Sequence, residues 1–324
     1  MTTRKNASPF QVPISRRNML LRTAGLLAAG PVAFADIARS ETANREKAVK
    51  KGRIKQSIVQ WCFELFGEKW SLEQTCTAAK QLGVESVELL TADQYPVLRE
   101  HGLTCAIGQI DMAPDPPFLR GFNNPAFRRE VIEVTKKAID GAAEYGVPNV
   151  ICFTGFSAVD PHDASSRGMD AEEGAANCVE GLKGVVGYAE EKGVTLCLEN
   201  LNTRDDSHPM KGHPGYQGDR VDYCVDIIKR VGSPRLKLLF DIYHAQIMEG
   251  DIIRRIREHR DYIGHVHTAG NPGRHEPDDS QELNYRPIME ALLEVGYTGY
   301  VGQEFLPTRD PYMGLHEAIT LCDV

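Results

Sequence analysis

The sequence lacks the glycine-rich motifs by which many proteins bind nucleotides. Neither G-x-G-x-x-G nor G-x-x-x-x-G-K-[ST] occurs in its 324 residues, so nucleotide binding by those loops is unsupported. It also lacks a low-complexity tract, and its 42% apolar and 25% charged residues are typical of a globular protein with a large core. The formal net charge of −8 disfavours nucleic acid as a partner.

The cysteines lack the close paired spacing of a disulfide framework. Most of the eight lie inside apolar runs, so we interpret them as buried thiols. Reduced thiols fit a protein that folds in the cytosol. The eight are Cys62, Cys76, Cys105, Cys152, Cys178, Cys197, Cys224 and Cys322.

Residues 1–35 lack acidic side chains and have the layout of an export signal. Basic residues precede the apolar stretch 24–35, which ends in the small-x-small triplet Ala33-Phe34-Ala35. About 12 apolar residues are too few to span a bilayer comfortably, so we expect no stable membrane span in the mature protein. The stretch "SRRNML" resembles a twin-arginine signal, with Arg16 and Arg17 as the pair. An uncleaved amphipathic anchor is the alternative.

We therefore predict export in the folded state by the twin-arginine route, to the periplasm. Removal of residues 1–35 would take away five basic side chains and change the formal net charge from −8 to −13. Residues 36–52 are charged and non-periodic, which indicates a flexible linker. The folded domain is then expected over residues 53–324.

From Arg53 onward, short β-rich runs alternate with longer amphipathic runs, in the order strand then helix, eight times. This alternation over about 270 residues fits a single closed (β/α)₈ TIM barrel better than a doubly wound sheet. The predicted strands are Ile54–Gln60, Ser86–Leu90, Thr104–Gly108, Asn149–Phe153, Thr195–Glu199, Lys237–Asp241, Tyr262–His267 and Gly299–Glu304. The clearest predicted helices are Leu72–Gln81, Ala126–Tyr145, Ala171–Glu191, Arg220–Val231, Arg286–Val295 and Pro311–Thr320.

Four successive predicted strands end in a side chain that can bind a divalent metal. The carboxyl ends of barrel strands meet at one mouth, so these residues should converge in space. A single acid after a strand is more often a helix N-cap, but four in succession favour a shared metal. Three carboxylates and one imidazole suit Mn²⁺, Mg²⁺ or Co²⁺, with Zn²⁺ as the alternative. The residues are Glu199 in "TLCLEN", Asp241 in "KLLFDIYH", His267 in "IGHVHT" and Glu304 in "YVGQEF".

The histidine among these four ligand positions has two candidates. His265 and His267 are two residues apart, so they share one face of the predicted strand. His265 lies one layer deeper and is expected to pack in the core, which leaves His267 as the metal ligand. Glu88, near the end of the second strand, is a weaker candidate for the site.

Polar and aromatic side chains that follow these ligands are candidates for substrate binding. Asn200 and Asn202 could hydrogen-bond hydroxyl groups. Arg274 could hold a carboxylate or phosphate, or else lie exposed in its loop and pair with Glu276. Trp61 could form an apolar wall or belong to the core. The full set of candidates is Trp61, Asn200, Asn202, His244, Arg274 and His275.

At these residues the chain resembles the xylose isomerase-like barrel superfamily, and within it the hydroxypyruvate isomerase-like group. The resemblance runs from about Ile54 to Pro307. It implies one divalent metal on the four predicted ligands, with Glu199 and Glu304 also transferring protons. One departure concerns His267, because hydroxypyruvate isomerases often carry glutamine there and ketose 3-epimerases carry histidine. The matching motifs are "LENLN", "FDIYHAQ", "GHVHTAGNPGRHEP", "GYVGQEFLP", "GFNNP" and "VICFTG".

The implied activity is a metal-dependent isomerisation through an enediolate of a small α-hydroxycarbonyl compound, as in hydroxypyruvate to tartronate semialdehyde. Return of the proton to the opposite face of the same carbon would instead make the protein a ketose 3-epimerase. A non-catalytic exported sugar-binding barrel is a third alternative. A barrel endonuclease is disfavoured by the net charge and by the few histidine ligands. The substrate, the outcome, the metal and the state as monomer or homo-oligomer are open at this point.

Overall fold

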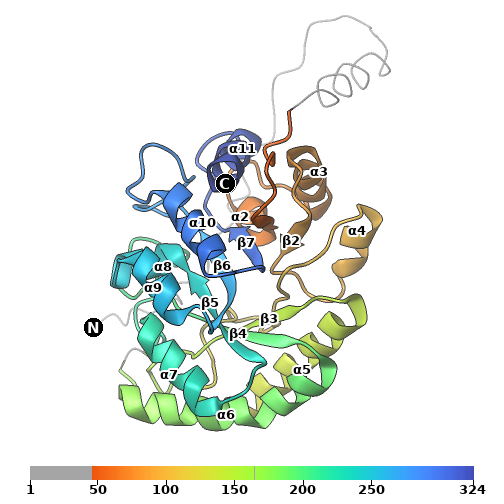
Figure 1. Ribbon diagram of the computed structural model, residues 1–324. Helices are drawn as coiled ribbons and strands as arrows, with labels where there is room; N and C mark the ends of the chain where they lie inside the picture. The colour runs from red at the N-terminus through yellow and green to blue at the C-terminus, as the bar shows by residue number, and fades with distance from the viewer. Residues whose placement is uncertain (1–45, 164) are drawn as a thin grey trace, which may run out of the picture. The chain divides into compact units, whose positions relative to one another are not determined.

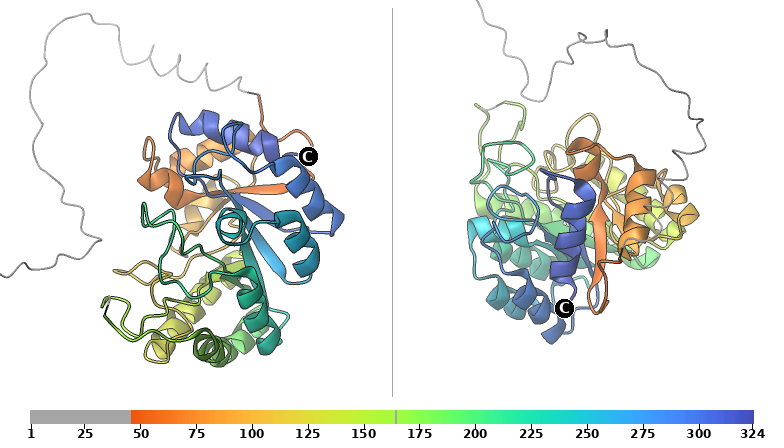
Figure 2. Two further views of the ribbon diagram at one scale, coloured as in Figure 1. Left: turned by 90° about the vertical axis from the view of Figure 1, so that its left-hand side faces the viewer. Right: turned by 90° about the horizontal axis from the view of Figure 1, so that it is seen from above.

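The computed structural model describes residues 46–163 and 165–324, and it places seven parallel strands in one sheet. The strands follow the order β2-β1-β7-β6-β5-β4-β3, and the helices lie around the outside of them (Figure 1). Figure 2 shows the same layering from two further directions. The strands are β1 (Lys55–Val59), β2 (Ser86–Glu88), β3 (Asn149–Cys152), β4 (Thr195–Glu199), β5 (Leu236–Asp241), β6 (Ile263–Thr268) and β7 (Tyr300–Gln303).

The predicted third strand, 104–108, fills the gap between β2 and β3 but is not a regular strand. It makes isolated parallel bridges on both sides, one of them between Gly108 and Val150. The ladder is interrupted because side chains replace backbone partners at Ala106. Its N–H donates to Ser86 Oγ at 2.9 Å, and its carbonyl accepts a hydrogen bond from Asn149 Nδ2 at 2.9 Å. The barrel therefore closes with seven regular strands and one irregular segment.

The six predicted helices all form, with ends shifted by a few residues. Ser71 begins α3 with a capping box to Gln74, and Gly83 ends it in the left-handed conformation. The four helices absent from the prediction, α2, α4, α8 and α9, are short, with six to eight residues each. The helices are α2 (Gln60–Leu65), α3 (Leu72–Leu82), α4 (Tyr95–Glu100), α5 (Arg128–Tyr145), α6 (Ala171–Lys192), α7 (Val221–Val231), α8 (Ile242–Met248), α9 (Ile252–His259), α10 (Tyr285–Glu294) and α11 (Pro311–Cys322).

The folded unit includes residues 46–52, which the sequence placed in the linker. The backbone N–H groups of Lys50, Lys51 and Gly52 donate to the carboxylate of Asp323, at 2.6–2.7 Å. These contacts fasten the segment to the end of α11. The predicted signal, 1–35, and the rest of the predicted linker lie outside the described residues. Within the described ranges, no helix has the length and apolar character to cross a membrane.

All eight cysteines are buried and form no disulfide, as predicted from their positions in apolar runs. The hydrophobic core is made largely of side chains from the strands and from the inner faces of the surrounding helices, such as Leu196, Leu238 and Val301. Buried charged groups gather instead at the carboxyl ends of β4, β5, β6 and β7. That end of the barrel is where the candidate site lies.

Candidate active site

The four predicted ligand side chains meet at the carboxyl end of the barrel. Glu199 ends β4, Asp241 ends β5, His267 lies near the end of β6, and Glu304 directly follows β7. Each is buried, and one ligand atom from each lies within 4.8 Å of those from the other three. His267 Nδ1 is 3.0 Å from Glu304 Oε2 and 3.4 Å from Glu199 Oε1. The chain thus brings together the four residues, whose role as metal ligands stays a prediction.

These residues fit a divalent cation on chemical grounds. Glu199 Oε1 and His267 Nδ1 are buried and have no hydrogen-bond partner within the described part of the chain. Three buried carboxylates face one imidazole and one guanidinium, so the cluster has an excess of negative charge that is costly away from water. A hard or borderline cation would neutralise that excess and take up the free lone pairs.

The surroundings shift the pKa values of the three carboxylates in different directions. Burial raises the pKa of Glu199, and it raises the pKa of Asp241 well above its usual range. Burial also acts to raise the pKa of Glu304, but the charges of Arg274 and His267 outweigh it and hold this pKa well below the usual range. Glu304 is therefore the carboxylate most strongly fixed in its charged form by the protein.

Arg274 is buried against the ligands and is not an exposed loop residue. Its Nη2 is 2.5 Å from Glu304 Oε2, and its Nη1 donates to the carbonyl of Met210 at 2.7 Å. Its backbone has φ 58°, a left-handed conformation that turns the side chain inward from its loop. The alternative pairing of Arg274 with Glu276 is wrong, because the Glu276 carboxylate accepts hydrogen bonds from Thr308 instead.

Trp61 belongs to α2 and reaches the ligands with its polar edge. Its Nε1 donates to Glu304 Oε1 at 3.1 Å, and its ring lies 5.3 Å from the guanidinium carbon of Arg274. Both oxygens of Glu304 therefore have protein donors. Trp61 also lines the cavity over the site, which agrees with the expected apolar wall.

His244 points its Nε2 at the ligand cluster, because Asp241 begins α8 as its N-cap. The side chain of Asp241 accepts a hydrogen bond from the His244 backbone at 2.9 Å. The backbone N–H of Asn202 donates to His244 Nδ1 at 3.0 Å, so the ring proton belongs on Nε2. His244 Nε2 is 3.9 Å from Asp241 Oδ2 and has no hydrogen-bond partner among the described residues. His244 is not among the side chains that line the cavity, so its predicted contact with substrate stays a prediction.

Asn200 and Asn202 were expected to bind substrate hydroxyls, but the structure gives their amides protein partners. Asn200 exchanges hydrogen bonds with the backbone of Asp241, from Nδ2 at 3.1 Å and to Oδ1 at 3.2 Å. Asn202 Nδ2 donates to the carbonyl of Lys211 at 2.8 Å. With these groups occupied, we assign the two asparagines to holding Asp241 and His244 in place.

A cavity of about 220 Å³ opens over Glu199, Glu304 and Arg274. Its walls are mostly apolar, and its polar groups are few. His275, a predicted substrate residue, is not among them; it is half-buried, and its Nε2 lies 3.4 Å from Lys211 Nζ. The remaining lining side chains are Trp61, Leu65, Leu89, Gln109, Pro116, Pro117, Phe118, Ile151, Phe153, Leu201, Met210 and His213.

His213 is a cavity residue that sequence reasoning missed. It is 4% exposed, its ring centroid lies 4.3 Å from that of Phe118, and burial lowers its pKa to about 3. It therefore faces the cavity as a neutral imidazole. The only signal was its place in "KGHPGY" after the β4 ligand, which carries no spacing pattern.

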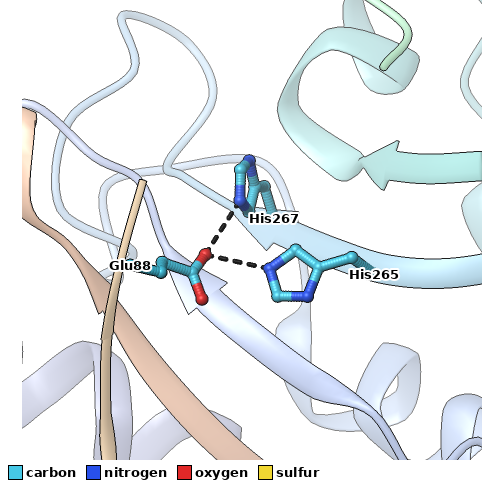
Figure 3. Close-up of side chains that lie close together, drawn as sticks. All are labelled: Glu88, His265 and His267. Carbon is cyan, nitrogen blue, oxygen red and sulfur yellow. Dashed lines mark hydrogen bonds and ion pairs between the residues drawn. The ribbon is translucent and has the colours of Figure 1, made fainter. Parts of the chain in front are cut away.

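Glu88 and His265 lie directly behind His267 (Figure 3). Glu88 Oε1 is 2.9 Å from both His265 Nε2 and His267 Nε2, and all three side chains are fully buried. Burial acts to raise the pKa of Glu88, but the charges of the two histidines and the hydrogen bonds from them lower it to about 2. His265 is thus the packed core histidine that was expected, and Glu88 is its partner.

The sequence matches a known protein family and several curated proteins. Residues 76–318 match the model of a family described as xylose isomerase-like TIM barrel. The 2-oxo-tetronate isomerase of Cupriavidus necator is 35% identical over 179 residues, which are 55% of this chain and 63% of that protein. The hydroxypyruvate isomerase of Escherichia coli is 28% identical over 191 residues, 59% of this chain and 68% of that protein. The chain thus spans less than two thirds of the first relative.

The matches to solved structures cover a larger share of the chain than the matches to these curated proteins. A structure described as an AP endonuclease of family 2 from Brucella melitensis has a TM-score of 0.69 and 26% sequence identity. The match covers 81% of this chain and 97% of that one.

Proposed function

Because the chain belongs to the xylose isomerase-like TIM barrel family, we propose that it is a metal-dependent isomerase of hydroxypyruvate isomerase type. It would move a proton on a small α-hydroxycarbonyl acid, the class to which hydroxypyruvate and 2-oxo-tetronate belong. One observation carries this proposal: Glu199 and Glu304 lie with Asp241 and His267 in one buried cluster at the floor of a cavity. The names of the curated relatives support it.

The chemistry needs a weakened C–H bond and groups that move its proton. A divalent cation held by the four ligands would polarise the hydroxycarbonyl group and stabilise the negative charge that develops on its oxygens. Glu199, which has one oxygen without a protein donor, is placed to take the proton. Glu304 is the second proton-transfer group, held by Trp61 and Arg274. Return of the proton to the carbonyl carbon gives the isomer.

His244 and the cavity walls would orient the substrate. The free Nε2–H of His244 would donate to a substrate oxygen beside Asp241. The mostly apolar walls give few partners to the additional hydroxyls of a long sugar chain, and this favours a short substrate. Arg274 is the cation nearest the ligands and would stabilise a substrate carboxylate while it remains paired with Glu304.

Proton exchange tests the proposal without prior choice of product. The full chain is stripped of metal with EDTA and incubated in D₂O with hydroxypyruvate, 2-oxo-tetronate, a free ketose or a sugar acid. We expect deuterium uptake at the hydroxycarbonyl carbon of the short acids, measured by ¹H NMR, only after Mg²⁺ is added back. Absence of exchange in every substrate with Mg²⁺, Mn²⁺ and Co²⁺ would rule the proposal out.

Replacement of Arg274 tests the choice of an acidic substrate. Arg274→Ala should raise KM for hydroxypyruvate about 10-fold or more, and considerably more than KM for a neutral ketose, because only the acid loses a charge partner. We expect kcat to fall for both, since Glu304 also loses its guanidinium. Arg254→Ala, a change at an exposed arginine, is the matched control. Equal effects on both KM values would remove the anion-binding role.

Epimerisation of a free ketose at C3 is the second candidate, and His267 favours it because the ketose 3-epimerases carry histidine at this position. Product analysis in the exchange experiment separates the two outcomes. The endonuclease alternative is less favoured, since the four-ligand cluster contains one histidine and the chain has a net charge of −8. We also propose export by the twin-arginine route, supported by the sequence of residues 15–35.

A further inference from the structure

We propose that Glu88 and His265 are positioning residues that prepare His267 as a metal ligand. Glu88 would accept the Nε2 proton of His267 and so direct the free lone pair of Nδ1 at Glu199 and Glu304 (Figure 3). The inference rests on the metal site of the proposed function. It assigns a role to a buried carboxylate and an imidazole that the proton-transfer chemistry leaves unused.

The contact joins opposite parts of the sequence inside the barrel. Glu88 ends β2, whereas His265 and His267 lie on β6, and neither of these strands neighbours the other in the sheet. The carboxylate therefore reaches across the barrel interior to the two imidazoles. All three side chains are fully buried, so water does not compete for these hydrogen bonds.

The tautomer of His267 follows from its partners. An imidazole that binds a metal is neutral, with one N–H donor and one acceptor nitrogen. Glu88 Oε1 lies 2.9 Å from His267 Nε2, whereas Nδ1 lies 3.0 Å from Glu304 Oε2 and 3.4 Å from Glu199 Oε1. A proton on Nε2 satisfies Glu88 and leaves the Nδ1 lone pair for a cation. A carboxylate behind a ligating histidine fixes the ring and raises its basicity.

His265 completes the arrangement by holding Glu88 in place. Its Nε2 lies 2.9 Å from the same oxygen, Glu88 Oε1, so one carboxylate oxygen receives two donors. The ring centroids of His265 and His267 are 5.0 Å apart, with the planes at 88°. Two roughly perpendicular rings directed at one oxygen restrict the carboxylate far more than a single hydrogen bond would.

Gly302 on β7 leaves the room that this arrangement needs. A Cβ at this position would lie within 3 Å of both Glu88 Oε1 and His267 Cδ2. The absence of a side chain there lets the carboxylate and the ring meet beside the β7 backbone. Three strands of the barrel, β2, β6 and β7, thus shape the hydrogen-bonded group behind the ligand cluster.

The same three side chains could in principle bind a second cation of their own. We favour positioning because His267 Nε2 would have to serve that second cation while Nδ1 served the first. The direct 2.9 Å contacts also already pair the nitrogens with Glu88 Oε1. Metal stoichiometry separates the two: positioning requires one cation per chain, and two would overturn it.

Cobalt binding to the full chain is the first test. We compare wild type, Glu88→Ala, Glu88→Gln and the control Glu85→Ala, whose side chain is exposed at the other end of β2. Positioning predicts one Co²⁺ per chain in wild type, an affinity about 10–100-fold weaker in Glu88→Ala, and an intermediate value in Glu88→Gln, which keeps an acceptor without the charge. The control should bind as wild type does. Unchanged Co²⁺ affinity in both Glu88 variants would overturn the inference.

Histidine NMR on the Mg²⁺-loaded protein, in which a bound cation excludes a proton from Nδ1, is the second test, and it does not depend on activity. ¹H–¹⁵N spectra should show His267 with its proton on Nε2 in wild type, and a loss of that single tautomer in Glu88→Ala, which removes the acceptor. A proton on Nδ1 in wild type would overturn the inference. If wild type shows the Nε2–H tautomer and binds one Co²⁺ but exchanges no substrate proton, the proposed function fails while the positioning role stands.

Discussion

Replacing either Glu199 or Glu304 by glutamine is expected to reduce kcat for proton transfer about 10²–10⁴-fold, the contribution typical of a positioned general base. Glutamine has nearly the same size as glutamate, but it cannot accept a proton at neutral pH and binds a divalent cation less strongly. The measurement is the rate of deuterium exchange into hydroxypyruvate at saturating Mg²⁺. Wild-type exchange in either variant would contradict the assignment of that residue to proton transfer.

The two variants should differ in what else they lose. Glu304 accepts hydrogen bonds from Trp61 Nε1 and Arg274 Nη2, so Glu304→Gln disturbs two partners beyond the metal site. Glu199 Oε1 has no such donor in the described structure, so Glu199→Gln should leave thermal stability closer to wild type. Glu191→Gln, at an exposed position late in α6, is the control and should change neither rate nor Tm.

Gly302→Ala is expected to lower both the stability of the fold and the activity of the site. The added methyl would meet Glu88 Oε1 and His267 Cδ2, and neither group can move freely because both side chains are fully buried. Overpacking of this kind typically lowers the free energy of unfolding by about 1–3 kcal/mol. Displacement of His267 should also reduce exchange activity about 10-fold or more, by the sensitivity of catalysis to small misplacements. Urea denaturation and the exchange assay measure the two effects.

Gly187→Ala is the matched control for Gly302→Ala. Gly187 lies on an exposed face of α6, and a Cβ there would meet nothing within 4 Å. The substitution should raise stability by about 0.5–1 kcal/mol, because alanine favours a helix over glycine. Equal stability changes for both substitutions would show that the space beside Glu88 is not restricted.

The convergence of the four ligand candidates could be predicted because it depends only on strand ends. The strand period places side chains such as Glu199 and Asp241 on the inner face of the barrel. They converge because parallel strands all end at one mouth. The fold followed from the same alternation. The segment 104–108 has the composition of a strand, but side chains of Ser86 and Asn149 replace part of its ladder, which composition does not reveal.

Contacts made through loops could not be predicted in the same way. Arg274 reaches Glu304 because its backbone adopts a positive φ, and glycine is the residue for which a sequence would suggest that conformation. The asparagines after β4 have the chemistry of substrate groups, yet their amides bond to Asp241 and Lys211. Whether a polar group faces protein or cavity depends on three-dimensional neighbours, and no spacing rule encodes them.

The pairing of β1 with β7 has a consequence for biosynthesis. Lys55 lies opposite Tyr300, so this seam of the cylinder can form only after nearly all of the barrel has left the ribosome. Until then both strands expose unpaired edges, to which other nascent chains can add. Topologies with such distant pairings also fold slowly. The yield of native protein should therefore depend on how well the cell protects the unpaired edges of β1 and β7 from association until the two strands pair.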